Sequence, residues 1–144
     1  LTVIVDIIER ISRKIKVLFI LHIPTKKNLE KFDLIEKIEK NDNIELKSRY
    51  DYFGFIKLIN NSEFVVSDGG SNQEECYYLG KPCLLLRNYT ERKEGLQENV
   101  VLSKFNNKVI DQFIIDYNDL SFTKIKKNDY PSDIIAKKIR IFSS

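Results

Sequence analysis

The sequence contains no methionine and only one histidine, and its two cysteines stand apart from each other. Complete translation products begin with methionine, so we expect the chain to be a fragment or a truncated reading frame. A zinc site needs several ligands at short spacings, and neither Cys76 nor Cys83 has a second ligand pair nearby. We therefore expect no metal site, and two free, buried thiols in a reducing cytosol.

Long apolar runs and a continuous basic stripe are also missing. The longest apolar runs, such as VLFIL and CLLL, are far too short to cross a bilayer. The first residues carry Asp6 and Glu9 without a cleavage site, so no secretory signal is visible. The net charge is only +3, and the lysines are scattered among glutamates and aspartates. These absences argue against a membrane or nucleic-acid partner and favour a cytoplasmic protein.

What the sequence does contain is the pattern of one soluble domain. Hydrophobic residues make up 42% of its 144 residues, enough for a single core. Apolar residues at helical spacing alternate with short apolar runs typical of strands. Helices are predicted around 4–11, 29–38, 55–61, 71–80, 107–120 and from 131, and strands at 16–21, 44–46, 64–67, 83–87 and 100–103. This alternation predicts an α/β fold, a Rossmann-like parallel sheet flanked by helices.

The segment Asp68-Gly69-Gly70-Ser71 lies between a predicted strand and the next predicted helix. In open parallel sheets, ligands bind at this carboxyl end of the strands. Adjacent glycines let a ligand approach the backbone, and the N–H groups that begin a helix favour an anion such as phosphate. Glu75, one turn into the helix, could accept hydrogen bonds from ribose hydroxyls. The residues predict an anion or nucleotide pocket, although a plain turn would also explain the glycines.

Part of this region also fits a purely structural explanation. Ser71 to Glu74 fits a capping box, with Ser71 as the N-cap and Glu74 reaching back to it. The glycine spacing does not fit a dinucleotide fingerprint, and no Gly-Lys-Ser/Thr follows as in a Walker loop. The lone His22, at the end of a predicted strand, is expected to be structural rather than catalytic.

The segment SDGGSNQEECYYLGKPCLLLRNYTERKEG (67–95) resembles the C-terminal domain of the UDP-N-acetylglucosamine 2-epimerase family. Members of that family read Asp-Ser-Gly-Gly-Ile/Leu-Gln-Glu-Glu, then Leu-Gly-Lys-Pro, then Arg and Thr-Glu-Arg-Pro-Glu at the same spacing. The residues that match without a gap are Asp68, Gly70, Gln73, Glu74, Glu75, Leu79, Gly80, Lys81, Pro82, Arg87, Thr90, Glu91, Arg92 and Glu94. The chain departs from the pattern at several points: Gly69 stands where the family has serine, Lys93 where it has proline, and Glu98-Asn99-Val100 where it has Ala-Gly-Thr. The family's His-Arg-x-Glu-Asn motif is also absent.

The resemblance implies that residues 1–144 are the C-terminal UDP-binding domain, one half of a GT-B fold, with the N-terminal domain missing. Gly69, Gly70 and Ser71 would bind the diphosphate through backbone amides, Glu75 would hold the ribose hydroxyls, and Arg92 would bind the leaving phosphate. The expected supporting residues are Asp68, Gln73, Arg87 and Glu91. No residue of this chain is assigned as catalytic, and no metal or cofactor is implied.

The implied reaction converts UDP-GlcNAc to UDP-ManNAc, or hydrolyses it to ManNAc and UDP, in amino-sugar and surface-polysaccharide biosynthesis. A GT-B glycosyltransferase with a UDP-sugar donor is an alternative, since it needs the same glycine-rich loop, although YTERKEG favours the epimerase. A non-catalytic truncated nucleotide-binding remnant is a second alternative. The expected partners are a UDP-sugar and the missing domain, and an apolar stripe at Ile134, Ile135 and Ile139 would favour a homodimer.

Overall fold

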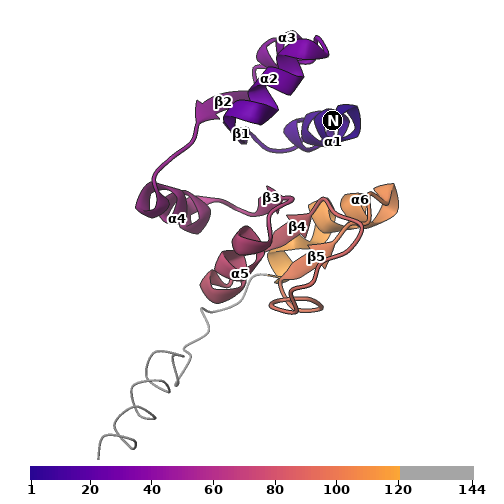
Figure 1. Cartoon of the computed structure of the whole chain (residues 1–144). Coiled ribbons are helices and arrows are strands. Elements are labelled where there is room, and N and C mark those ends of the chain that lie inside the picture. Colours follow the sequence, from indigo (N-terminus) through magenta and orange to yellow (C-terminus); the bar gives the residue numbers. More distant parts are fainter. Residues whose placement is uncertain (121–144) are drawn as a thin grey trace, which may run out of the picture.

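The computed structural model describes residues 1–120 of the chain (Figure 1). The helices are α1 (Thr2–Ser12), α2 (Ile23–Lys31), α3 (Ile35–Glu39), α4 (Tyr52–Asn61), α5 (Gly70–Leu79) and α6 (Asn107–Asp116), followed by the 3-10 helix η1 (Tyr117–Leu120). The strands are β1 (Val17–Leu21), β2 (Ile44–Ser48), β3 (Val65–Ser67), β4 (Cys83–Leu85) and β5 (Val100–Leu102). The helix predicted from Pro131, with the apolar stripe expected to favour a homodimer, lies outside the described residues.

The paired strands of residues 1–120 are parallel and form two sheets. β1 pairs with β2, so that Val17 lies opposite Ile44. In the second sheet β4 lies between β3 and β5, with Val65, Cys83 and Val100 in register. Helices α2 and α3 connect β1 to β2, and α5 connects β3 to β4. The predicted α/β fold with parallel strands is therefore confirmed.

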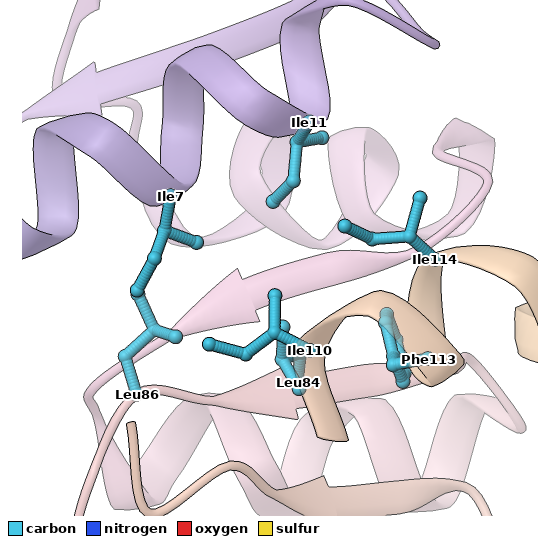
Figure 2. Packing of buried hydrophobic residues seen from close by; sticks show 7 residues of the cluster. All are labelled: Ile7, Ile11, Leu84, Leu86, Ile110, Phe113 and Ile114. Carbon is cyan, nitrogen blue, oxygen red and sulfur yellow. The ribbon is translucent and has the colours of Figure 1, made fainter. Parts of the chain in front are cut away.

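Strand β4 is buried on both of its faces. Leu84 contributes to one hydrophobic cluster, and Cys83 and Leu85 contribute to another. The first cluster, shown in Figure 2, joins β4 to α1 and α6 through Ile7, Ile11, Leu84, Leu86, Ile110, Phe113 and Ile114. The second joins it to α4, α5 and β5 through Ile59, Cys76, Cys83, Leu85 and Val100. Because successive strand residues point to opposite faces, the unbroken run CLLL suits a strand covered on both sides.

Helix α1 holds the two sheets together. Val5 and Ile8 pack in a cluster with residues of α2, α3 and β2. Ile7 and Ile11 pack instead against β4 and α6 (Figure 2). The helical spacing predicted for this segment is thus confirmed, and the apolar residues of α1 pack in two different hydrophobic clusters. Helix α1 therefore packs against residues of both sheets.

The helix predicted around 29–38 is in fact two helices, so that prediction was wrong. Asp33 takes a left-handed backbone conformation with φ 53°, which ends α2 before α3 begins. Asp tolerates this region better than most residues. The break lets Leu29 and Ile38 both reach the core while Phe32 stays 58% exposed. Within residues 1–120 no helix is long and apolar enough to cross a membrane.

Candidate functional site

The loop after β3 leads directly into the N-terminus of α5. Gly69 is the N-cap in an extended conformation, and no side chain caps the helix at this end. The first backbone hydrogen bond of the helix runs from the N–H of Gln73 to the carbonyl of Gly69, at 3.3 Å. Within the described chain, the N–H groups of Gly70, Ser71 and Asn72 therefore have no backbone acceptor. Three adjacent donors at the positive end of a helix are suited to bind an anion.

The capping box predicted for this helix is wrong. Ser71 is the second residue of α5 rather than its N-cap, because the helix already begins at Gly70. Glu74 does not reach back to the helix N-terminus, since its carboxylate accepts a hydrogen bond from Nη1 of Arg92. The donors at the start of α5 thus stay available because their expected side-chain partner is engaged elsewhere.

Ser67 and Asn72 are site residues that sequence reasoning missed. The Ser67 hydroxyl accepts hydrogen bonds from the N–H of Gly69 at 3.0 Å and from Nδ2 of Asn72 at 2.7 Å. These bonds fix the loop even though Gly69 stands at the position where the family has serine. They also engage one of the three backbone donors expected to bind the diphosphate, that of Gly69. A serine two residues before a tight bend is a known local signal for such a turn.

Arg92 lies directly over the backbone of Gly70. A Cβ at Gly70 would be 3.0 Å from Cδ of Arg92 and closer still to its Nε, so only glycine leaves room for the arginine there. The guanidinium pairs with Glu74, and both side chains are 34% exposed. Its Nε is buried without a hydrogen bond and lies 3.9 Å from Oε1 of Glu91. A guanidinium therefore stands beside the open amides of α5.

Glu75 lines a cavity that Arg92 does not line. This cavity of about 1320 Å³ is also lined by Asp68, Ser71 and Asn72, and by His22 at the end of β1. No hydrogen bond or ion pair to Glu75 occurs among residues 1–120. Burial raises the pKa of the Glu75 carboxyl above its ordinary value, and the neighbouring Glu74 carboxylate raises it further. This carboxylate is thus partly desolvated without a compensating partner.

The structure brings most of the predicted residues to one end of α5. Glycines 69 and 70, Ser71 and Asp68 form the bend, Glu75 faces the cavity, and Arg92 lies over the neighbouring helix face without lining that cavity. Arg87 and Glu91 lie in the loop after β4, where they pair at 3.6 Å. Gln73 is fully buried and hydrogen-bonded to the loop that carries Arg92. No cluster of metal-ligating side chains occurs in the described part of the chain.

A parallel sheet, an uncapped helix N-terminus at its carboxyl edge and an arginine beside it define a Rossmann-like α/β domain suited to an anionic ligand. The chain matches the family model for UDP-N-acetylglucosamine 2-epimerase over residues 1–140. It therefore belongs to the UDP-N-acetylglucosamine 2-epimerase family, as its sequence motifs predicted.

Individual relatives agree with this assignment. The chain is 37% identical over 110 residues to a UDP-N-acetylglucosamine 2-epimerase homolog of Methanococcus maripaludis, a match that covers 75% of this chain and 30% of that protein. It is 35% identical over 107 residues to the UDP-N-acetylglucosamine 2-epimerase of Methanocaldococcus jannaschii, covering 73% of this chain and 29% of that protein. The chain thus spans about 30% of the length of these curated relatives.

Solved structures confirm the fold. The UDP-GlcNAc 2-epimerase of Methanocaldococcus jannaschii superposes with a TM-score of 0.82 at 28% identity, covering 99% of this chain and 40% of that one. A structure of the same enzyme in complex with UDP-GlcNAc and UDP gives a TM-score of 0.76 at 28% identity, again covering 99% and 40%. The predicted α/β sheet forming one half of a GT-B fold is therefore confirmed.

Replacing Glu75 by glutamine is expected to stabilise the chain at pH 7 and to change its stability little at pH 4. The raised pKa means that the folded chain holds this proton more tightly than the unfolded chain, so stability is lost as pH rises through the folded pKa. Glutamine cannot ionise and avoids this loss. Urea denaturation at several pH values measures the difference.

The matched control is Glu98→Gln, which removes the same charge at an exposed position. We expect its stability to follow that of the parent at each pH. A Glu75→Gln variant that is no more stable than the parent at pH 7 would contradict the picture of a partly buried carboxylate without a partner.

Proposed function

We propose that residues 1–144 form the C-terminal UDP-binding domain of a UDP-N-acetylglucosamine 2-epimerase. The enzyme would convert UDP-GlcNAc to UDP-ManNAc, or hydrolyse it to ManNAc and UDP, for amino-sugar and surface-polysaccharide biosynthesis. Family membership and the complex of a similar enzyme with UDP support the substrate. The observation that carries the proposal is the set of open amides at the start of α5 with Arg92 beside them.

The arrangement fits the chemistry of the proposed reaction. Breaking the bond between the sugar and the diphosphate places negative charge on the leaving phosphate. The N–H groups of Gly70, Ser71 and Asn72 have no backbone acceptor and lie at the positive end of the helix, where that charge would develop. The guanidinium beside Gly70 would add charge-assisted hydrogen bonds. Donors fixed in place before the reaction stabilise such charge most effectively.

Glu75 is proposed to hold the ribose hydroxyls. Its carboxylate lines the cavity next to the bend and has no partner among residues 1–120, so both oxygens remain available as acceptors. A carboxylate in contact with phosphate would repel it, which is consistent with Glu75 lining a cavity that Arg92 does not line. The diphosphate and the ribose would then contact adjoining faces of the same helix end.

The cytoplasm is the proposed compartment. Cys76 and Cys83 are both buried and free, although they belong to one hydrophobic cluster. Contact with Cys76 and burial raise the pKa of the Cys83 thiol well above its ordinary value, which keeps it protonated. Neighbouring thiols that stay reduced are typical of a reducing environment.

The 144-residue chain is expected to bind UDP, and Arg92→Ala is expected to weaken that binding by about tenfold or more. Hydrogen bonds to charged groups contribute roughly 1.5–3 kcal/mol, and about 1.4 kcal/mol corresponds to a factor of ten. Isothermal titration calorimetry or a chemical-shift titration gives the dissociation constants. Arg13→Ala, which removes the same charge at an exposed position after α1, serves as the control.

We expect the control to leave UDP affinity within about twofold of the parent, since exposed charges at a distance are screened. Equal losses in the two variants would indicate a general charge effect and contradict a phosphate contact by Arg92. Failure of the parent chain to bind UDP would favour the degenerate remnant over the epimerase domain.

The same 144 residues are expected to bind UDP-GlcNAc without converting it. The residues at the start of α5 serve binding and charge stabilisation, and no residue of this chain is proposed as the acid or base that inverts carbon 2. Incubation with UDP-GlcNAc and analysis of the sugar products by NMR tests this expectation. Formation of UDP-ManNAc or free ManNAc by this chain alone would contradict it.

A further inference from the structure

Gln73 is a polar residue of α5 that the structure buries completely. Its side chain does not hydrogen-bond within its own helix but reaches across to the loop between β4 and β5. Its Nε2 donates to the carbonyls of Arg92 at 3.2 Å and of Glu94 at 2.9 Å. Its Oε1 accepts a hydrogen bond from the hydroxyl of Thr90 at 2.8 Å. Both donors of the amide are thus used, and both go to the segment that carries Arg92.

Thr90 also hydrogen-bonds to the backbone of Arg92. The Thr90 hydroxyl accepts a hydrogen bond from the N–H of Arg92 at 3.3 Å while it donates to Gln73. The backbone of Arg92 is therefore held at its N–H by Thr90 and at its carbonyl by Gln73. The side chain that leaves this fixed point lies over Gly70 and pairs with Glu74.

The loop that carries Arg92 has little other regular structure to fix it. Residues 86–99 form no helix or strand between β4 and β5. Irregular loops of this length vary in conformation unless side chains tie them down. An arginine on such a loop would lose side-chain and backbone entropy on binding an anion, and a rigid anchor lowers that cost.

We propose that Gln73 is a positioning residue for nucleotide binding: through the backbone of Arg92 it sets the guanidinium beside the open amides of α5. The proposal rests on the proposed function, in which those amides and Arg92 bind the diphosphate of UDP. It adds that the affinity for the phosphates, but not for the nucleoside, depends on a buried amide that does not contact the ligand.

Asn99 offers a matched comparison because it is buried in the same way. It is fully buried, and its Nδ2 donates to two backbone carbonyls, those of Cys76 at 3.0 Å and Lys81 at 2.8 Å. These bonds tie the far end of the same loop to the C-terminal end of α5. None of them reaches Arg92 or the first turn of α5. A residue that is merely structural should therefore behave like Asn99.

The test compares Gln73→Met with Asn99→Leu, two nearly isosteric changes that each remove a buried amide. Dissociation constants for UDP and for uridine are measured by chemical-shift titration, which reaches millimolar values, and stability by urea denaturation. We expect both variants to lose stability. Only Gln73→Met should weaken UDP binding, by about tenfold, a loss within the range for a hydrogen bond to a charged group. Uridine affinity should stay within about twofold in both variants.

A double-variant cycle identifies the route of the effect. In an Arg92→Ala background, adding Gln73→Met should change UDP affinity by less than about twofold, because the group that Gln73 positions is already gone. An additional tenfold loss in that background would overturn the proposal, as would equal losses of UDP affinity in Gln73→Met and Asn99→Leu.

Thr90→Val keeps the test decisive if Gln73→Met does not fold. This change removes the hydroxyl at a half-buried loop position and leaves Gln73 in place, and it should weaken UDP about threefold without affecting uridine. UDP binding unchanged in Thr90→Val, or weakened together with uridine, would overturn the positioning role. A parent chain that does not bind UDP overturns the proposed function and this inference with it, whereas normal UDP binding by Gln73→Met overturns the inference alone.

Discussion

The site depends on one feature, the first turn of α5 with its unpaired N–H groups. A helix whose N-terminus is capped by a side chain has little to offer a ligand, and here the cap residue is Gly69, which has no side chain. Glu74 would be the natural competitor for these donors, and it pairs with Arg92 instead. This ion pair thus keeps Glu74 away from the donors and holds the Arg92 guanidinium beside them.

The fold explains why these groups meet. Because β4 is buried on both faces, the elements next to it must present apolar residues to it. α5 does so through Cys76. The N-terminus of α5 follows β3 and lies at the carboxyl edge of the sheet. The loop after β4 leaves that edge and returns over α5, where Gln73 holds it. α1 packs against both sheets, and His22 at the end of β1 lines the same cavity as Glu75.

Much of the fold could be predicted from the sequence because apolar periodicity reports burial directly. The stop of α5 at Gly80, found at φ 62°, also follows from local chemistry. The break at Asp33 could not be predicted, since the apolar spacing continues through it. Neither could the burial of Gln73, because a polar residue beside two glutamates looks like helix surface. The hydrogen bond between the Ser67 hydroxyl and Asn72, five residues further on, depends on the path of the loop in space and could not be predicted either.

Nuclear magnetic resonance of the backbone amides tests the central claim most directly. On titration with UDP, the amide signals of Gly70, Ser71 and Asn72 should shift together, and uridine alone should move them far less. The first-turn amides of α6, which the Asn106 side chain caps, provide an internal reference that should stay in place. Shifts confined to other parts of the chain, with the first turn of α5 unmoved by UDP, would contradict the account.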